Sequence, residues 1–319
     1  MKVTVTAEGF DPATVELKPT PVLAERVFLH VWPDTQQEAL SPSDPRFGYR
    51  GGYTASEKPH LLCQVGDPIG WLDTPNTAGD PEQQYDRFAG RAIAPVAAAG
   101  VQTSLIPGNH GGEAVVGPGF GVPAGSANPA RNAHEALRAT ADFDRYLAPY
   151  TGAGATLWQP GKLTNRVEPV RGCPGWFVAG MEMWPRAEVV DWVVSQIGAL
   201  PSHARVILNT HMWTEPDGSL STSNGGYGDM SPAQAWARLA PLRRVAMVTS
   251  GHVGTHAESV LGPDGKPAER GTVCFNTTFH AEGWTPVRTV LIEGDRVTSW
   301  IVDASDRKVR SVSQHTIAL

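Results

Sequence analysis

The chain has 319 residues, of which 41% are hydrophobic and 18% are charged, and its formal net charge is −6 at pH 7. This length allows one large domain or two small ones, and the composition is that of a globular protein rather than a disordered one. The acidic balance speaks against general nucleic-acid binding, which needs a basic face. A small phosphorylated substrate remains compatible with it, because a bound metal reverses the local charge.

The three cysteines, Cys63, Cys173 and Cys274, are far apart, and no CxxC motif occurs. This pattern predicts three buried thiols rather than a disulfide framework or a zinc–thiolate site. The sequence shows neither a signal-peptide pattern nor an apolar run of the roughly 20 residues that a membrane span needs. We therefore expect a cytoplasmic protein by default, without membrane contact, while secretion and the oligomeric state stay open.

The N-terminal part alternates apolar and polar residues around a turn, which predicts a β-hairpin in residues 1–24. Helical spacing over residues 81–99 ends at Gly100, a typical helix stop. A stretch rich in Gly, Pro and Ala at 111–129 predicts a long loop, and a helix is expected at 133–147. Apolar runs predict buried strands at residues 27–32, 60–65 and 102–106.

The C-terminal part continues the alternation, with helices expected at 188–200 and 233–239 and a loop at 218–228. Strands are predicted at 176–182, 205–209, 245–249, 272–277, 287–292 and 297–302. This order predicts an α/β fold with a β-rich C-terminal part. Because no linker is visible, we expect one domain, residues 25–319, with the hairpin appended.

Polar side chains follow five of the apolar runs: Asp34, Asp67, Asn109 with His110, His211 and His252. Ligands of α/β sheets bind just beyond the carboxyl ends of strands, so these side chains are expected to share one crevice. Oxygen and imidazole donors in this mixture favour Mn, Fe, Zn or Mg over Ca or Cu(I). The set is too large for one metal and fits two. Gly66, Gly108 and Gly251 precede three of these positions and would let the backbone turn sharply.

In chain order the motifs are Asp34-Thr35-Gln36, Gly66-Asp67, Gly108-Asn109-His110, Thr210-His211 and Gly251-His252. From about residue 27 to about residue 302 this series resembles the calcineurin-like metallophosphoesterase superfamily. A narrower resemblance, to a bacterial branch with Asp-Thr-Gln and Gly-His-x-Gly motifs, rests on Trp71–Pro75, Met181–Arg186 and Ser250–Thr255. The resemblance implies a four-layer αββα sandwich of two mixed β-sheets.

The resemblance also implies a role for each matching residue. Asp34 and Gln36 would bind the first metal, Asp67 would bridge both metals, and the second metal would be held by Asn109, His211 and His252. His110 would be catalytic, protonating the leaving oxygen or stabilising the transition state. Two divalent ions would activate a hydroxide that attacks the phosphorus. The chain would then be a hydrolase of small phosphate esters, acting as a phosphomonoesterase or a phosphodiesterase.

The sequence departs from the superfamily pattern at four positions. Gln36 stands where many members carry His, and Gly254 replaces the second His of Gly-His-x-His. Gly70 replaces the last acid of Gly-Asp-x-x-Asp, and Gly111 follows His110 where an acid is frequent. These changes deplete the first metal site and leave the second intact. The alternatives are therefore a non-catalytic or mononuclear binding module on the same fold, and a mononuclear hydrolase of another ester.

Three further residues are candidates for supporting roles. Glu182 ends a predicted strand and would orient a metal ligand, and His280, which follows a strand of the tail, would line the crevice. His256, two residues after Gly254, either substitutes for the missing second His of the last motif or, as the resemblance to the bacterial branch implies, has no such role. A serine hydrolase is not indicated, because no Gly-x-Ser-x-Gly motif occurs.

Overall fold

The computed structural model describes residues 23–70, 81–111, 138, 140–225, 229–279 and 283–317, together with the backbone of two short strands near the N-terminus. Those strands, β1 (Lys2–Val5) and β2 (Ala13–Glu16), pair in antiparallel fashion as the predicted hairpin requires. The division into a hairpin of residues 1–24 and a domain of residues 25–319 stays a prediction.

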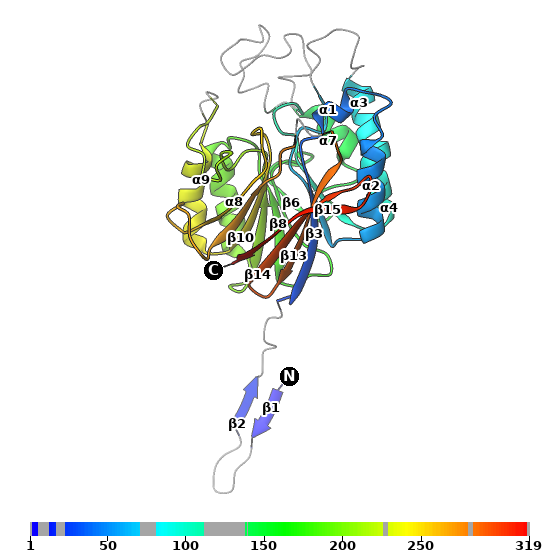
Figure 1. Cartoon of the computed structure of the whole chain (residues 1–319). Coiled ribbons are helices and arrows are strands. Elements are labelled where there is room, and N and C mark those ends of the chain that lie inside the picture. The colour runs from blue at the N-terminus through cyan, green and yellow to red at the C-terminus, as the bar shows by residue number, and fades with distance from the viewer. Residues whose placement is uncertain are drawn as a thin grey trace.

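One of the two large sheets has six strands in the spatial order β15-β14-β13-β3-β4-β5 (Figure 1). Its strands β3, β4 and β5 run parallel to one another, whereas the other three join by antiparallel pairing, so the sheet is mixed. In chain order they are β3 (Arg26–Trp32), β4 (Leu61–Gln64), β5 (Gln102–Leu105), β13 (Pro286–Glu293), β14 (Arg296–Asp303) and β15 (Lys308–Thr316).

The other large sheet has seven strands in the order β11-β12-β10-β9-β8-β7-β6. Its centre, from β8 to β12, is parallel, and the strands at both edges are antiparallel to their neighbours. In chain order they are β6 (Thr156–Leu157), β7 (Arg166–Pro169), β8 (Trp176–Gly180), β9 (Arg205–Asn209), β10 (Val245–Ser250), β11 (Ala257–Leu261) and β12 (Thr272–Asn276).

The two sheets pack face to face through a shared apolar core, in which Leu29 and Cys63 of one sheet meet Ile207 and Phe275 of the other. Helices cover both outer faces. On the six-stranded sheet lie α1 (Gln36–Ala39), α2 (Arg46–Glu57), α3 (Pro81–Arg87), the π-helix η1 (Phe88–Ile93), α4 (Ala94–Ala98) and α7 (Ala141–Leu147). On the seven-stranded sheet lie α8 (Ala187–Ala199), α9 (Pro232–Leu239) and the 3₁₀ turn η2 (Ala240–Leu242). The predicted αββα sandwich is confirmed.

Most of the predicted elements are present, and the differences have local causes. The helix expected at 81–99 is helical through Ala98 but contains the π-helix, where the backbone N–H of Ala94 bonds to the carbonyl of Ala89, five residues back. The helix expected at 133–147 is described for Ala141–Leu147, and most of its remainder lies outside the described residues, as does most of the expected loop at 111–129.

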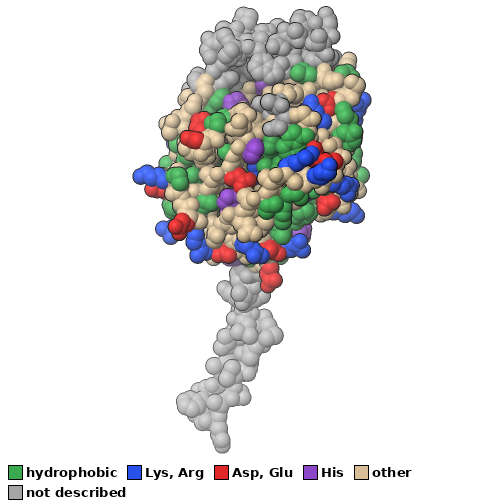
Figure 2. Space-filling view, in the orientation of Figure 1, with side chains coloured by type: hydrophobic (Ala, Val, Ile, Leu, Met, Phe, Trp, Pro, Cys, Tyr) green, Lys and Arg blue, Asp and Glu red, His purple; other side chains and the backbone are tan. Residues whose placement is uncertain are grey.

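The sequence pattern does not predict α1, α2, β6, β7, β11 or β15. The last of these is an exposed edge strand, with Val309 and Val312 more than half exposed. Figure 2 shows hydrophobic side chains beside Lys and Arg side chains on the face where β15 lies. Charged residues such as Lys308 and Arg310 discourage pairing of such an edge with another chain.

The three cysteines are buried and free, as expected. Within the described ranges, no helix has both the length and the apolar character that crossing a bilayer would require.

Candidate metal centre

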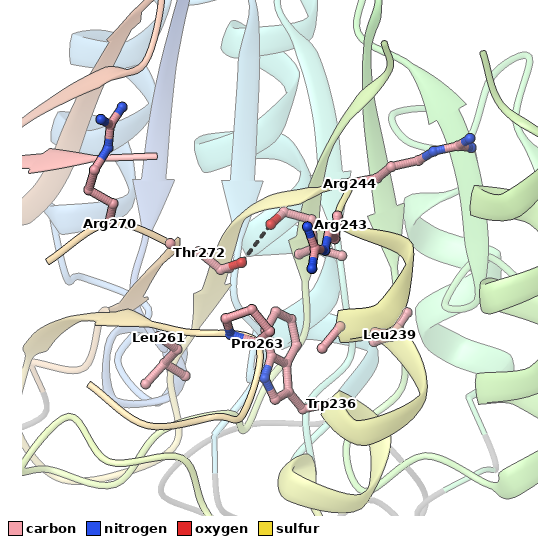
Figure 3. Close-up of a pocket in the computed structure, with 11 residues that line it drawn as sticks. Trp236, Leu239, Arg243, Arg244, Leu261, Pro263, Arg270 and Thr272 are labelled. Atoms are coloured by element: carbon pink, nitrogen blue, oxygen red, sulfur yellow. Dashed lines mark hydrogen bonds between the residues drawn. The ribbon is translucent and has the colours of Figure 1, made fainter. Parts of the chain in front are cut away.

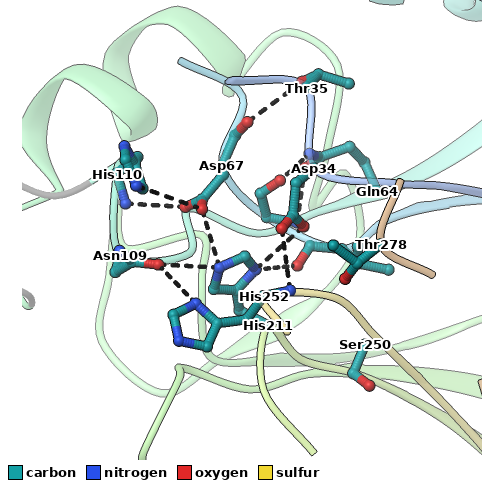
Figure 4. Close-up of polar contacts among 12 residues, drawn as sticks. Asp34, Thr35, Gln64, Asp67, Asn109, His110, His211, Ser250, His252 and Thr278 are labelled. Carbon is teal, nitrogen blue, oxygen red and sulfur yellow. Dashed lines mark hydrogen bonds and ion pairs between the residues drawn. The ribbon is translucent and has the colours of Figure 1, made fainter. Parts of the chain in front are cut away.

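The polar residues predicted to share a crevice do converge, and both sheets contribute to them (Figure 4). Asp34 follows β3 and Asp67 follows β4, while Asn109 and His110 follow β5 of the same sheet. His211 and His252 follow β9 and β10 of the other sheet. All of these strands present their carboxyl ends to one edge of the sandwich, which is the expected place for a ligand in such sheets.

The two sheets are joined by hydrogen bonds just below this edge. The side-chain amide of Asn209, at the end of β9, donates to the carbonyls of Ser104 at 2.7 Å and Gln64 at 3.2 Å, both in the opposite sheet. Its side-chain oxygen accepts from the Thr249 hydroxyl at 3.0 Å. Asn209 is fully buried, so these bonds are shielded from water and fix how the two halves of the site face one another.

The centre of the site is a compact group of Asp67, His211 and His252, whose potential ligand atoms all lie within 4.8 Å of one another. The Nε2 atom of His211 lies 3.1 Å from Asp67 Oδ2 and 3.0 Å from Asn109 Oδ1. The same amide oxygen of Asn109 is 3.1 Å from Nδ1 of His252. Two imidazoles, an amide oxygen and a carboxylate therefore point at a common position.

A backbone carbonyl fixes the ring orientation of His211. Its Nδ1 atom lies 2.6 Å from the carbonyl of Val65 and donates a hydrogen bond to it, which turns Nε2 toward Asp67. A histidine held in this way by a backbone carbonyl is typical of metal ligands. Burial disfavours a charged ring, but Asp67 and Asp34 outweigh burial and raise the pKa of His211 to about 9. The site therefore stabilises positive charge at this position.

Asp67 is held by its neighbours on both sides. Its Oδ1 accepts from the backbone N–H of His110 at 2.8 Å, and its own N–H donates to the Pro107 carbonyl at 3.0 Å. Thr35 donates its backbone N–H to the Asp67 carbonyl at 3.1 Å. Burial raises the pKa of this carboxyl, but His211 and His110 outweigh burial and hold it below the ordinary value, so Asp67 is ionised.

Asp34 and His110 flank this group. Asp34 Oδ2 accepts from the backbone N–H of His252 at 3.0 Å, and its Oδ1 is 3.7 Å from His211 Nδ1. His110 is buried, and its Nε2 lies 3.9 Å from Asp67 Oδ2. The structure thus brings together six of the predicted residues: Asp34, Asp67, Asn109, His110, His211 and His252. Their individual roles stay predictions.

The backbone at the site is unusual. Among the described residues, six non-glycine residues have positive φ, and three of them, Asp67 (53°), Trp184 (43°) and His252 (71°), lie at this edge. Such conformations cost free energy in L-residues and gather where function requires a particular side-chain direction. Trp184 packs edge-on against His252, with ring centroids 5.5 Å apart. Trp184 is not among the site candidates of the sequence, where only its place shortly after the predicted strand at 176–182 could have indicated this contact.

The three glycines of the motifs are required, but for two different reasons. Gly66 and Gly108 have φ of +114° and +68°, as the predicted sharp turns need. Gly251 does not have positive φ; a Cβ there would approach Asp34 Oδ1 to under 3.0 Å. A Cβ on Gly66 would approach His211, and one on Gly108 would approach Asp67, equally closely. A side chain at any of these three positions would therefore keep Asp34, Asp67 and His211 from lying as they do.

Two of the departures from the superfamily pattern also have a packing cause. At Gly70 a Cβ would come within 3.0 Å of the Gln36 carbonyl and the Leu40 side chain, and at Gly111 it would meet Pro107. Neither position accommodates an acid. Gly254 differs, because it is exposed and nothing lies within 4 Å of where its Cβ would be. The chain therefore has room for the missing histidine but does not carry it.

The remaining candidates are less closely tied to this group. Gln36 is buried at the start of α1, two residues after Asp34, and its role as a ligand stays a prediction. The Glu182 carboxylate binds the side chains of Asn165 and Arg186, each at 2.8 Å. His256 is exposed and stacks on Phe279 at 4.9 Å. His280 lies outside the described residues, as does the Trp71–Pro75 segment.

The donor set suits a divalent cation. An ionised carboxylate, an amide oxygen and two imidazoles converge on one position, and His211 directs a ring nitrogen there from a fixed orientation. These are ligands that Mn, Fe, Zn and Mg accept. Asp34, on the other side of His211, would contribute to a neighbouring position.

Comparison with solved structures shows the fold. A purple acid phosphatase from yellow lupin (Lupinus luteus) seeds aligns with a TM-score of 0.62 and 11% identity, over 96% of this chain and 56% of its own. PhoD aligns with a TM-score of 0.58 and 14% identity, over 95% of this chain and 71% of its own. A dimetal phosphatase from Danio rerio aligns with a TM-score of 0.50 and 10% identity, over 92% of this chain and 99% of its own. This chain thus spans little more than half of the lupin enzyme.

No protein-family model matches the chain, and no curated protein does. At such low identity the structural likeness shows the fold alone, which is that of the calcineurin-like metallophosphoesterases. The predicted resemblance is confirmed at that level. The bacterial branch stays a prediction.

Proposed function

We propose that the chain is a metal-dependent hydrolase of phosphate esters that holds two divalent ions at the carboxyl ends of its strands. One observation carries the proposal: Asp67, Asn109, His211 and His252 direct ligand atoms at one position from two sheets. The phosphatases of the same fold support it, since a dimetal phosphatase is among them. The substrate is expected to be a small phosphomonoester or phosphodiester.

In this proposal Asn109, His211 and His252 would hold one ion, Asp34 and Gln36 would hold the other, and Asp67 would serve both. When bound, such ions neutralise phosphoryl oxygens and lower the pKa of bound water. The chain itself contributes orientation. The Val65 carbonyl fixes the ring of His211, and Thr35 and Pro107 fix the backbone of Asp67.

His110 would act on the substrate rather than on a metal. It is buried next to Asp67, and its own backbone N–H bonds to that carboxylate at 2.8 Å. A proton on His110 would serve either to stabilise charge on the phosphoryl oxygens or to protonate the leaving oxygen. Because positioning and electrostatics dominate phosphoryl transfer, the position of His110 would matter more for the rate than the acidity of its ring.

The test is turnover of p-nitrophenyl phosphate and bis(p-nitrophenyl) phosphate with added Mn²⁺ in Asp67→Asn. Asparagine has the same shape and tolerates the positive φ of position 67, so we expect the variant to fold. We expect activity to fall at least about 100-fold, as when one electrostatic group is lost from such a site. The matched control is Asp217→Asn, since the Asp217 carboxylate accepts hydrogen bonds from the backbone N–H and the hydroxyl of Ser219 on an exposed turn. Unchanged turnover in Asp67→Asn would refute the proposal.

A second candidate, a mononuclear or non-catalytic binding module, is favoured by one observation. The first metal position lacks the histidine that Gly254 replaces, and packing excludes acids at Gly70 and Gly111. Metal binding without hydrolysis of either ester, under every added metal, would favour this candidate.

A further inference from the structure

A cavity, whose lining Figure 3 shows, lies at the end of the seven-stranded sheet where β10 begins, opposite to the metal centre. Its volume is about 300 Å³, and its walls include Val245, where β10 begins, and Thr272, where β12 begins. His252 follows the other end of β10, so the length of a strand separates the two sites. A volume of this size lies at the lower end of the range for small-molecule sites.

The floor of the cavity is apolar. Trp236 and Leu239 come from α9, and Leu261 and Pro263 come from the end of β11 and the turn after it. The Trp236 ring is fixed in place, since its N–H donates to the Gly262 carbonyl at 3.3 Å. The indole N–H is thereby used, and the flat apolar face is what the side chain offers to a ligand.

The charged residues of the lining are all basic: Arg243, Arg244 and Arg270. Two of them are already engaged. Arg244 donates to the carbonyls at the end of α8, including Leu200 at 2.8 Å, and Arg270 pairs with Asp295 at 2.6 Å. In Figure 3 both side chains extend away from Trp236.

Arg243 is different. Among the described residues its guanidinium has no hydrogen bond or ion pair, and its side chain extends toward the Trp236 side of the cavity (Figure 3). Its backbone has φ of 49°, a conformation that an arginine adopts at a cost. A planar guanidinium beside an apolar floor is suited to a carboxylate that carries an apolar body, because it can bind both oxygens at once.

We infer that this cavity is a second ligand site, which binds a small carboxylate with an aromatic or aliphatic body. The apolar body packs on Trp236 and Leu261, and the carboxylate pairs with Arg243. The site is independent of the metal centre and of the proposed hydrolase activity.

The experiment measures binding of 4-phenylbutyrate and of its neutral analogue 4-phenylbutan-1-ol, by ligand-observed NMR and calorimetry. The wild-type chain is expected to bind the carboxylate about ten-fold or more tightly than the alcohol, and Arg243→Gln to abolish this preference. The matched control is Arg238→Gln. Arg238 lies in α9, five residues before Arg243, but it pairs with Asp191 on the surface, outside the cavity.

Asp67→Asn provides the second control, since it alters the metal centre and leaves the cavity intact. Circular dichroism and thermal unfolding verify that each variant is folded. The inference is overturned if neither probe shows saturable binding, or if Arg243→Gln binds the carboxylate as tightly as the wild type. It is also overturned if binding is lost in Asp67→Asn, because the probe would then occupy the metal centre.

Discussion

Replacing Gly108 by alanine tests whether the close approach around Asp67 is what builds the site. Gly108 has φ of +68°, and an added Cβ would lie under 3.0 Å from both Asp67 Oδ1 and the Asp67 backbone nitrogen. The left-handed conformation costs about 1–2 kcal/mol in alanine, and overpacking costs about 1–3 kcal/mol more. We therefore expect Gly108→Ala to lower the free energy of unfolding by about 2–5 kcal/mol.

Gly100→Ala is the matched control, because Gly100 has φ of +84° and nothing lies within 4 Å of its would-be Cβ. It should lose only the conformational part, about 1–2 kcal/mol. Urea denaturation of both variants gives the difference, and metal titration shows whether Gly108→Ala also weakens metal binding. Equal destabilisation in the two variants, with metal affinity unchanged, would refute the view that Gly108 is kept free of a side chain for Asp67.

Two further predictions concern metal binding near Gly254 and the stability of the fold at low pH. Because Gly254 is exposed with open space around it, Gly254→His should raise the bound metal by up to one ion per chain, measured by mass spectrometry. The control is Gly48→His, at an exposed position of α2. An equal metal count in both variants would contradict this prediction. Burial raises the pKa of Glu258, but His315 and Arg288 outweigh burial and lower it from 4.5 to about 2. Its stabilisation is therefore complete above pH 4.5 and lost as the pH falls through about 2, so the stability gap between wild type and Glu258→Gln should shrink over that range in urea denaturation. A gap that is independent of pH would show that ionisation of Glu258 does not contribute.

The convergence of the candidate ligands was largely predictable, because they follow buried strands whose apolar runs are plain in the sequence. Asp67 and His211 are examples, since each comes within three residues of the end of a strand whose last residues are buried. Parallel strands place their carboxyl ends on one edge, so the sequence order of the motifs translates directly into proximity. The ring orientation of His211 could not be predicted, because it depends on the backbone carbonyl of Val65 in the opposite sheet.

The missed elements are those in which tertiary packing overrides local preference. The helix α2 contains three glycines, and Gly51 is needed because a Cβ there would come under 3.0 Å from the carbonyl of Ala92. The strand β7 carries Arg166 fully buried, which no apolar pattern reveals. Arg166 is satisfied by Glu168 at 2.9 Å and by Ser104 of the opposite sheet at 2.8 Å.

Among the departures from the superfamily pattern, some are explained by tertiary packing and one is not. The sequence shows that Gly70 and Gly111 replace acids, but only the packing shows that no side chain fits there. Gly254 stands in open space, so its identity is a property of this chain and not a demand of the fold.

The most direct test of the central claim is an anomalous-scattering map of crystals grown with Mn²⁺. We predict two peaks, one between Asp67, His211 and His252 and the other beside Asp34. Both peaks should vanish in Asp67→Asn. One peak would indicate a mononuclear site, and a map without any peak between Asp67, His211 and His252 would refute the proposed metal centre.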